Sequence, residues 1–120
     1  MRTTTPNFMA TPTQVVEKIK IKVSYYNPAL GGINCYQFHN GECVSKMANG
    51  ERWQDWINNG AIACPFEIDL EQKIHFDGNT YVCKDRGSKV VFDGEFYWID
   101  ILTDNPEYSF GDSFDAILLY

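Results

Sequence analysis

Positive charge is scarce in this chain of 120 residues, and long apolar runs are missing. Ten lysines and arginines stand against 16 aspartates and glutamates, which gives a net charge of −6. Nucleic-acid affinity depends largely on basic side chains that neutralise phosphates, so this balance argues against a nucleic-acid partner. No stretch approaches the roughly 20 apolar residues of a membrane-spanning helix, and we expect no membrane span.

The first 14 residues lack the apolar segment of a secretory signal. They are rich in threonine and proline and show no periodicity, so we interpret residues 1–14 as an extended N-terminal arm, either disordered or laid along a partner. Residues 15–120 suffice for one domain and are too few for two. Hydrophobic residues make up 44% of the chain and aromatic residues 15%, which is enough for a core.

No Cys-x-x-Cys pair is present, so the cysteine spacing gives little support for a zinc site, and we predict no metal and no cofactor. Four cysteines allow three pairings, among which the sequence does not choose. Cys35 and Cys43 flank a turn-rich segment and could close a short loop. The alternative is that these two cysteines and the remaining pair, Cys64 and Cys83, are all reduced thiols.

A long helical pattern is also missing, and short strands dominate instead. The alternation of apolar residues with lysines from Glu17 to Tyr25 predicts a strand with one buried face. Asp-Gly turns predict two hairpins, one joining residues 73–76 to 80–84 and one joining residues 89–92 to 95–102. Residues 113–120 suit a closing strand. Such closely spaced short strands are typical of a mostly β barrel or sandwich.

One short helix is expected in residues 48–57. Trp53, Trp56 and Ile57 are spaced so that they share one helical face, and Asn49 is a plausible N-cap. We expect the two tryptophans to be core anchors.

Three segments occur in an informative order. They are Ser24-Tyr25-Tyr26 before Gly31-Gly32, Ala48-Asn49-Gly50-Glu51 before Ala61-Ile62-Ala63, and residues 82–88 before Trp98-Ile99-Asp100-Ile101. Together they resemble the double-psi β-barrel of the three-aspartate (3D) domains, the lytic transglycosylase A family, the rare-lipoprotein-A family and the expansins. The resemblance covers about residues 20–103. It implies a small six-stranded double-psi β-barrel in residues 15–120, with one short helix and the N-terminal arm.

The resemblance also implies a site. Asp100 matches the catalytic acid of the transglycosylases, and Asp85 matches a turn aspartate that the rare-lipoprotein-A branch also needs. Paired carboxylates suit this chemistry, because each disfavours ionisation of the other and one can then donate a proton to a glycosidic oxygen. The substrate-binding positions that follow from the match are Tyr25, Tyr26, Asn49, Glu51 and Cys64.

Other interpretations of these residues remain open. Cys64 stands where the related families have a third aspartate or a histidine, and a thiol is a poor proton donor. Asp85 could simply cap a turn by accepting backbone N–H groups. Asp100 lies on the opposite face of its strand from Ile99 and Ile101, so it is either in solvent or in a cleft. Tyr25 and Tyr26 could stack on sugar rings, or one of them could belong to the core.

Two main functions follow, and a third, a wall module that binds carbohydrate without cleaving it, lies between them. The first is a peptidoglycan-acting, lytic-transglycosylase-like enzyme that cleaves glycan strands by aspartate acid/base chemistry. The alternative is a non-catalytic barrel that serves as a structural or binding protein, for example in a phage virion, where the arm could join subunits into a homo-oligomer. The expected partners are therefore glycan strands or neighbouring protein subunits, and the expected location is extracellular, in the cell wall or in a virion.

Overall fold

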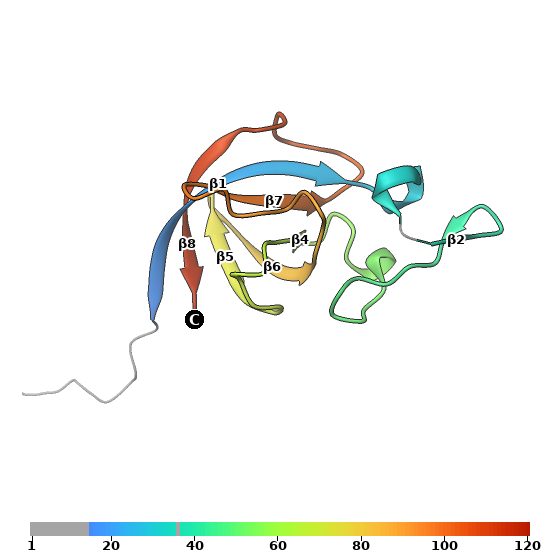
Figure 1. Cartoon of the computed structure of the whole chain (residues 1–120), viewed down its shortest axis with the longest axis horizontal. Helices are drawn as coiled ribbons and strands as arrows, with labels where there is room; N and C mark the ends of the chain where they lie inside the picture. The colour runs from blue at the N-terminus through green and yellow to red at the C-terminus, as the bar shows by residue number, and fades with distance from the viewer. Residues whose placement is uncertain (1–14, 36) are drawn as a thin grey trace, which may run out of the picture.

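The computed structural model describes residues 15–35 and 37–120. Six strands close a barrel in the order β1-β7-β4-β6-β5-β8 (Figure 1). Their bounds are β1 Val16–Tyr26, β4 Ala61–Ala63, β5 Lys73–Phe76, β6 Asn79–Asp85, β7 Tyr97–Leu102 and β8 Ser113–Leu119. The mostly β class and the six-stranded barrel are thus confirmed. The predicted arm, residues 1–14, lies outside the described residues.

The strand order repeats itself in the two halves of the barrel. Exchanging β1, β4 and β5 for β6, β7 and β8 leaves every neighbour relation unchanged. Each half contributes one strand to each of two parallel pairs, β1–β7 and β4–β6, and the antiparallel pair β4–β7 lies between them. The four strands β1, β7, β4 and β6 therefore form one continuous surface, and the candidate site is built on it.

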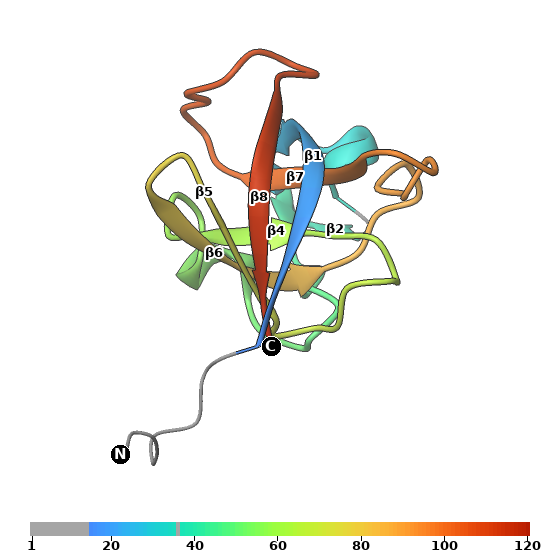
Figure 2. The same cartoon turned by 90° about the vertical axis from the view of Figure 1, so that its left-hand side faces the viewer.

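Alternating side chains fill the barrel, as the sequence pattern predicts. On β1, Ile19, Ile21 and Val23 point into the core, and Ile99 does so from β7. Tyr120 N–H donates to the Val15 carbonyl, so the last strand ends beside the start of the first (Figure 2). No helix among the described residues is long and apolar enough to cross a membrane.

The first predicted hairpin is confirmed, and the second forms only at its tip. β5 and β6 pair antiparallel around Asp77-Gly78, both of which have positive φ angles. Residues 89–92 form no strand; within them only Phe92 makes a single bridge, to Tyr97. The reason is local, because the Val90 N–H donates to the Gly87 carbonyl and is used in a turn.

The short helix is smaller than the sequence pattern predicts. Only a 3-10 turn forms there, η3 Trp53–Asp55, and its N-cap is Arg52 rather than Asn49. A segment this short cannot offset the cost of helix nucleation. Trp53, together with Trp56 and Ile57, still packs on a small second core of Met47, Ala61 and Leu102, as expected for anchors.

The segment joining β1 to β4, residues 27–35 and 37–60, forms an outer lobe beside the barrel (Figure 1). It contains η1 Pro28–Leu30, η2 Gly32–Asn34, β2 Phe38–His39, β3 Glu42–Cys43 and η3. A disulfide joins Cys35 to Cys43 within this lobe, which is the loop closure that the sequence allowed. A second disulfide joins Cys64 to Cys83 in the barrel.

Candidate active site

A row of four residues crosses the four-stranded surface. Ser24 on β1 pairs with Asp100 on β7, Asp100 pairs with Ala63 on β4, and Ala63 pairs with Asp85 on β6. Residues directly opposite one another on neighbouring strands point to the same face, so both aspartates flank Ala63 on one side of the sheet. Two strand spacings place their Cα atoms about 10 Å apart. That spacing leaves room for carboxyl separations of about 5 to 9.5 Å, which glycoside hydrolases use.

A β-bulge brings Asp85 to this face. The register between β4 and β6 shifts between Ile62 and Ala63, so that Ala63 faces Asp85 instead of Lys84. Side chains alternate along a strand, and Cys83 already points into the core. Without the shift, Asp85 would follow Cys83 into the barrel interior. Bulges are known to re-aim side chains next to active sites.

The two aspartates line a cleft of about 650 Å³ between the barrel surface and the outer lobe. Tyr26, Ala63 and Arg86 line it from the barrel side. The lobe contributes its opposite wall, which includes Pro28, Asn34, Ser45, Lys46, Ala48 and Trp53. The small side chain of Ala63 leaves open the space between Asp85 and Asp100.

Asp85 is held as an acceptor by three donors. Its Oδ1 accepts the Ala48 N–H at 2.9 Å and the Arg86 N–H at 2.8 Å, and its Oδ2 accepts the Tyr26 hydroxyl at 3.0 Å. An ionised carboxylate is acceptor-only and satisfies all three donors. Asp85 therefore caps the turn that follows β6 and also lines the cleft, so the two interpretations left open by the sequence hold together.

The environment of Asp100 differs from that of Asp85, because it disfavours the ionised form of the carboxyl. Burial raises its pKa, and the negative charge of Asp85 raises it further, to about 6. Asp100 therefore keeps its proton to a much higher pH than an ordinary aspartate, whose pKa is about 3.8. Of the two environments considered from the sequence, the cleft is the one observed. A carboxyl with a raised pKa beside a second, hydrogen-bonded carboxyl is an arrangement that suits acid/base catalysis.

Tyr26 holds Asp85 and lines the same cleft as Asp100. Burial, followed by the charge of Asp85, raises the pKa of its hydroxyl, so the hydroxyl stays protonated and donates to Asp85. Tyr26 pairs with Leu102, two residues after Asp100 on β7. This side chain orients Asp85 while also lining the cleft.

Arg86 holds the turn that follows β6 in place, and no sequence pattern offered a reason to select this residue. Its Nη1 donates to the Pro65 carbonyl at 2.8 Å and to the Cys64 carbonyl at 3.1 Å, and its guanidinium lies 5.0 Å from the centre of the Phe66 ring. The side chain thus ties the end of β6 to the chain leaving β4. An arginine after Asp85 was visible in the sequence, but its partners come from a distant segment.

Cys64 lies beneath the cleft rather than in it. Its side chain is fully buried, it is bonded to Cys83, and the cleft is lined at this point by Ala63 instead. The side chain therefore has no surface with which to contact a substrate. Its disulfide joins the residue that follows β4 to β6, next to the bulge that presents Asp85.

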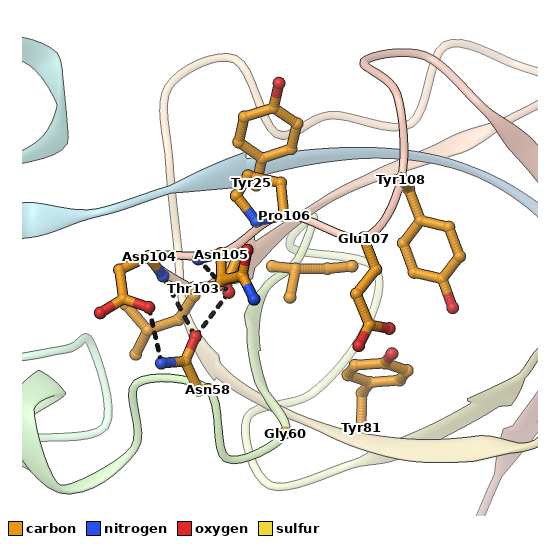
Figure 3. A pocket seen from close by; sticks show the side chains of 12 residues that line it. Tyr25, Asn58, Gly60, Tyr81, Thr103, Asp104, Asn105, Pro106, Glu107 and Tyr108 are labelled. Carbon is orange, nitrogen blue, oxygen red and sulfur yellow. Dashed lines mark hydrogen bonds between the residues drawn. The ribbon is translucent and has the colours of Figure 1, made fainter.

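Tyr25 faces a different cavity. Because successive side chains of β1 point to opposite faces, Tyr26 lines the cleft and Tyr25 points to the barrel mouth. There it lines a pocket with Tyr81 and Tyr108 (Figure 3). The structure therefore separates the two tyrosines that the sequence placed in one substrate-binding set.

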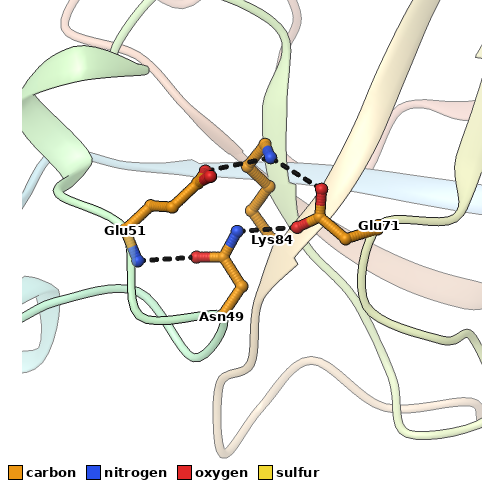
Figure 4. Close-up of polar contacts among 4 residues, drawn as sticks. All are labelled: Asn49, Glu51, Glu71 and Lys84. Carbon is orange, nitrogen blue, oxygen red and sulfur yellow. Dashed lines mark hydrogen bonds and ion pairs between the residues drawn. The ribbon is translucent and has the colours of Figure 1, made fainter.

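Asn49 and Glu51 also lie away from the two aspartates. Glu51 and Glu71 flank the ammonium group of Lys84 at 3.0 and 2.9 Å, and Asn49 donates to Glu71 at 2.7 Å (Figure 4). Burial alone would lower the pKa of Lys84, but hydrogen bonds and charge from the two glutamates raise it. The same contacts lower the pKa values of both glutamates. This network holds the outer lobe against β6.

No group of three or more potential metal ligands occurs among residues 15–35 and 37–120. In the comparisons with known proteins, no family model, no curated protein and no solved structure matches the chain. The functional argument therefore depends on the geometry and electrostatics of the cleft.

Proposed function

We propose that the cleft cleaves glycan strands of peptidoglycan, with Asp100 as the proton donor. One observation carries the proposal. Asp100, with a pKa raised to about 6, shares a cleft with Asp85, whose oxygens accept three hydrogen bonds. Glycosidic cleavage needs a carboxylic acid that is still protonated near neutral pH and a second group that stays charged.

The reaction follows the lytic transglycosylase pattern that the sequence resembles. Asp100 donates its proton to the glycosidic oxygen as the bond from that oxygen to the anomeric carbon breaks. The 6-hydroxyl of the same sugar then attacks the anomeric carbon, and the Asp100 carboxylate takes up the hydroxyl proton. The products are a free hydroxyl on one fragment and a 1,6-anhydro ring on the other, and Asp100 is again protonated.

Asp85 transfers no proton in this step and supports it through its charge. Its charge adds to the effect of burial in raising the pKa of Asp100, and it stabilises the positive charge that develops on the sugar ring. The hydrogen bonds from Tyr26, Ala48 and Arg86 hold the carboxylate in place.

Membership of the double-psi barrel superfamily belongs to the same proposal. It is supported by the closed barrel of parallel and antiparallel strands, by the repeat of the strand order, and by the convergence of residues 26, 85 and 100 on one cleft. The two disulfides favour an oxidising compartment. This supports a location in the cell wall, the extracellular space or a virion.

Purified sacculi provide the test. The wild-type protein should release soluble muropeptides with 1,6-anhydro ends at pH 5, whereas Asp100→Asn should reduce the rate by about 100-fold or more, as expected for loss of a general acid. Asp115→Asn is the matched control, because Asp115 is an exposed aspartate on β8 outside the cleft. Equal release by the wild type and Asp100→Asn would remove the proposal.

A non-catalytic barrel is the second candidate, and one observation favours it. The third acidic or histidine position of the related families is occupied by a disulfide-bonded cysteine, Cys64. A structural or binding protein would need the barrel and the disulfide but no proton donor. In that case the wild type would bind sacculi or a virion partner and release no muropeptides at any pH.

A further inference from the structure

The mouth of the barrel holds a second cavity, separate from the cleft. It measures about 350 Å³ and shares no lining residue with the cleft (Figure 3). Tyr25 continues the inward-facing series of Ile21 and Val23, and Ile101 continues that of Ile99. The cavity is therefore the open end of the barrel interior, and mouths of β-barrels are a recurrent place for small-molecule sites.

Three tyrosines shape this cavity. Tyr81 stacks on Phe76 in the core with ring centres 4.6 Å apart, and Tyr108 packs edge-on against Phe114 at 5.1 Å. The Tyr108 hydroxyl also donates to Asp77 at 2.7 Å. The core thus holds both rings in place, while Tyr25, which is 42% exposed, presents its ring at the rim.

The loop that closes the cavity is held in a fixed position. The Asn58 side chain donates to the Asp104 carboxylate at 2.8 Å and accepts the Thr103 hydroxyl at 2.5 Å (Figure 3). It also accepts the Asp104 N–H at 3.1 Å. These contacts tie the chain leaving β7 to the chain entering β4, so the cavity is formed before any ligand arrives and binding needs little reorganisation.

The lining defines a ligand chemistry. Aromatic rings offer flat apolar surfaces, and Asn105 and Glu107 add an amide and a carboxylate that can bind hydroxyl groups. The cavity has no lysine or arginine in its lining, and its two carboxylates disfavour an anionic ligand. At about 350 Å³ it is at the small end of ligand sites, which span about 300–1,000 Å³.

We propose that the barrel mouth binds a neutral sugar ring, with its C–H face on the tyrosines and its hydroxyls on Asn105 and Glu107. The site takes the end or one exposed unit of a glycan, and it does not cleave it. It is independent of catalysis in the cleft. A barrel that is catalytically inert would bind sugars at the mouth in the same way.

NMR titration of the full-length Asp100→Asn protein with the N-acetylglucosamine tetramer tests this site separately from the cleft. We expect amide shifts at Tyr25, Tyr81, Asn105 and Glu107. Tyr25→Ala should raise the apparent Kd obtained from these shifts about tenfold, because the aromatic face is lost. Tyr25→Phe should keep the wild-type Kd. Tyr120→Ala is the control, since Tyr120 is an exposed tyrosine outside the cavity.

Two results would overturn the proposal. One is a titration in which the mouth residues do not shift, whether or not the cleft residues do. The other is an equal affinity for an oligogalacturonate of the same length, because the carboxylates of the lining should repel it. Failure of the cleavage proposal would appear instead as an absence of muropeptide release by the wild-type protein, which is a separate measurement.

Discussion

At the residue scale, the protonation of Asp100 couples stability to the proposed catalysis. Its pKa is raised from 3.8 to about 6, first by burial and then by Asp85. The folded state thus holds this proton more tightly than the unfolded state does. The resulting stabilisation is complete below about pH 4 and is lost as the pH rises through 6.

Asp100→Asn should therefore stabilise the protein at neutral pH. A pKa difference of this size corresponds to about 2–3 kcal/mol. The free energy of unfolding of Asp100→Asn, measured by urea denaturation, should exceed that of wild type by about 2 kcal/mol at pH 7.5, and the two should be nearly equal at pH 4. Asp115→Asn should change little at either pH. A destabilised Asp100→Asn at pH 7.5 would contradict the assigned environment.

The charge of Asp85 can be tested on the same proton. In Asp85→Asn, the pKa of Asp100 should fall below about 6 but stay above its ordinary value, because burial is the larger cause and remains. A carbon-13 NMR titration of the side-chain carboxyls of wild type and Asp85→Asn measures this directly. An unchanged Asp100 titration would mean that the two carboxyls are not electrostatically coupled.

Asp85 and Asp100 were identifiable from the sequence because they belong to recognisable segments. Ala63 and Arg86 were not, since one acts by being small and the other by contacts with residues 64–66, about 20 positions away. Tyr25, Asn49, Glu51 and Cys64 were grouped with the aspartates by the resemblance. Strand alternation, a buried lysine and a disulfide place them elsewhere.

At the element scale, the bulge between β4 and β6 presents Asp85 to the cleft, and β6 is also one strand of the hairpin with β5. The hairpin could be predicted because Asp-Gly matches the positive φ angles that a tight turn requires. The bulge could not, because its cause is the pairing of two strands about 20 residues apart in the chain. The helix prediction was too long because its apolar spacing reflects packing of a loop on Leu102 and Ala61.

The turn of the hairpin gives a clean conformational test. Gly78 has φ +78°, and an added Cβ would meet no atom within 4 Å. Gly78→Ala should therefore lower the free energy of unfolding by about 1 kcal/mol through backbone strain alone. Gly78→Asn should cost less, because asparagine tolerates this conformation. Thermal denaturation of both variants beside wild type is the measurement, and an Asn variant less stable than the Ala variant would contradict the turn assignment.

At the scale of the whole molecule, two disulfides hold the cleft together from opposite sides. Cys35–Cys43 stabilises the outer lobe, and Cys64–Cys83 joins β4 to β6 beneath the aspartates. Barrel closure and these pairings bring together residues that are far apart in the chain. Local patterns predict the strands and the β5–β6 hairpin, but they contain no information on which strands distant in the chain become neighbours.

Removing the disulfides should therefore have different effects. The Cys64→Ala/Cys83→Ala double variant lacks the cross-link between two positions 19 residues apart, and it should lose about 3 kcal/mol of stability. The Cys35→Ser/Cys43→Ser variant should lose less, because its loop spans 8 residues. Denaturant unfolding of both double variants tests the order. A larger loss of stability in the Cys35→Ser/Cys43→Ser variant would contradict the expectation that Cys64–Cys83 stabilises the fold more.

The most direct test of the account is the pH dependence of glycan cleavage. The rate of release of 1,6-anhydro fragments from sacculi, followed by mass spectrometry from pH 4 to 8, should be highest below pH 6. Above that value it should fall about tenfold per pH unit as Asp100 loses its proton. A rate that is unchanged between pH 5 and 8, or the absence of fragments at every pH, would contradict the assignment of Asp100 as a catalytic acid.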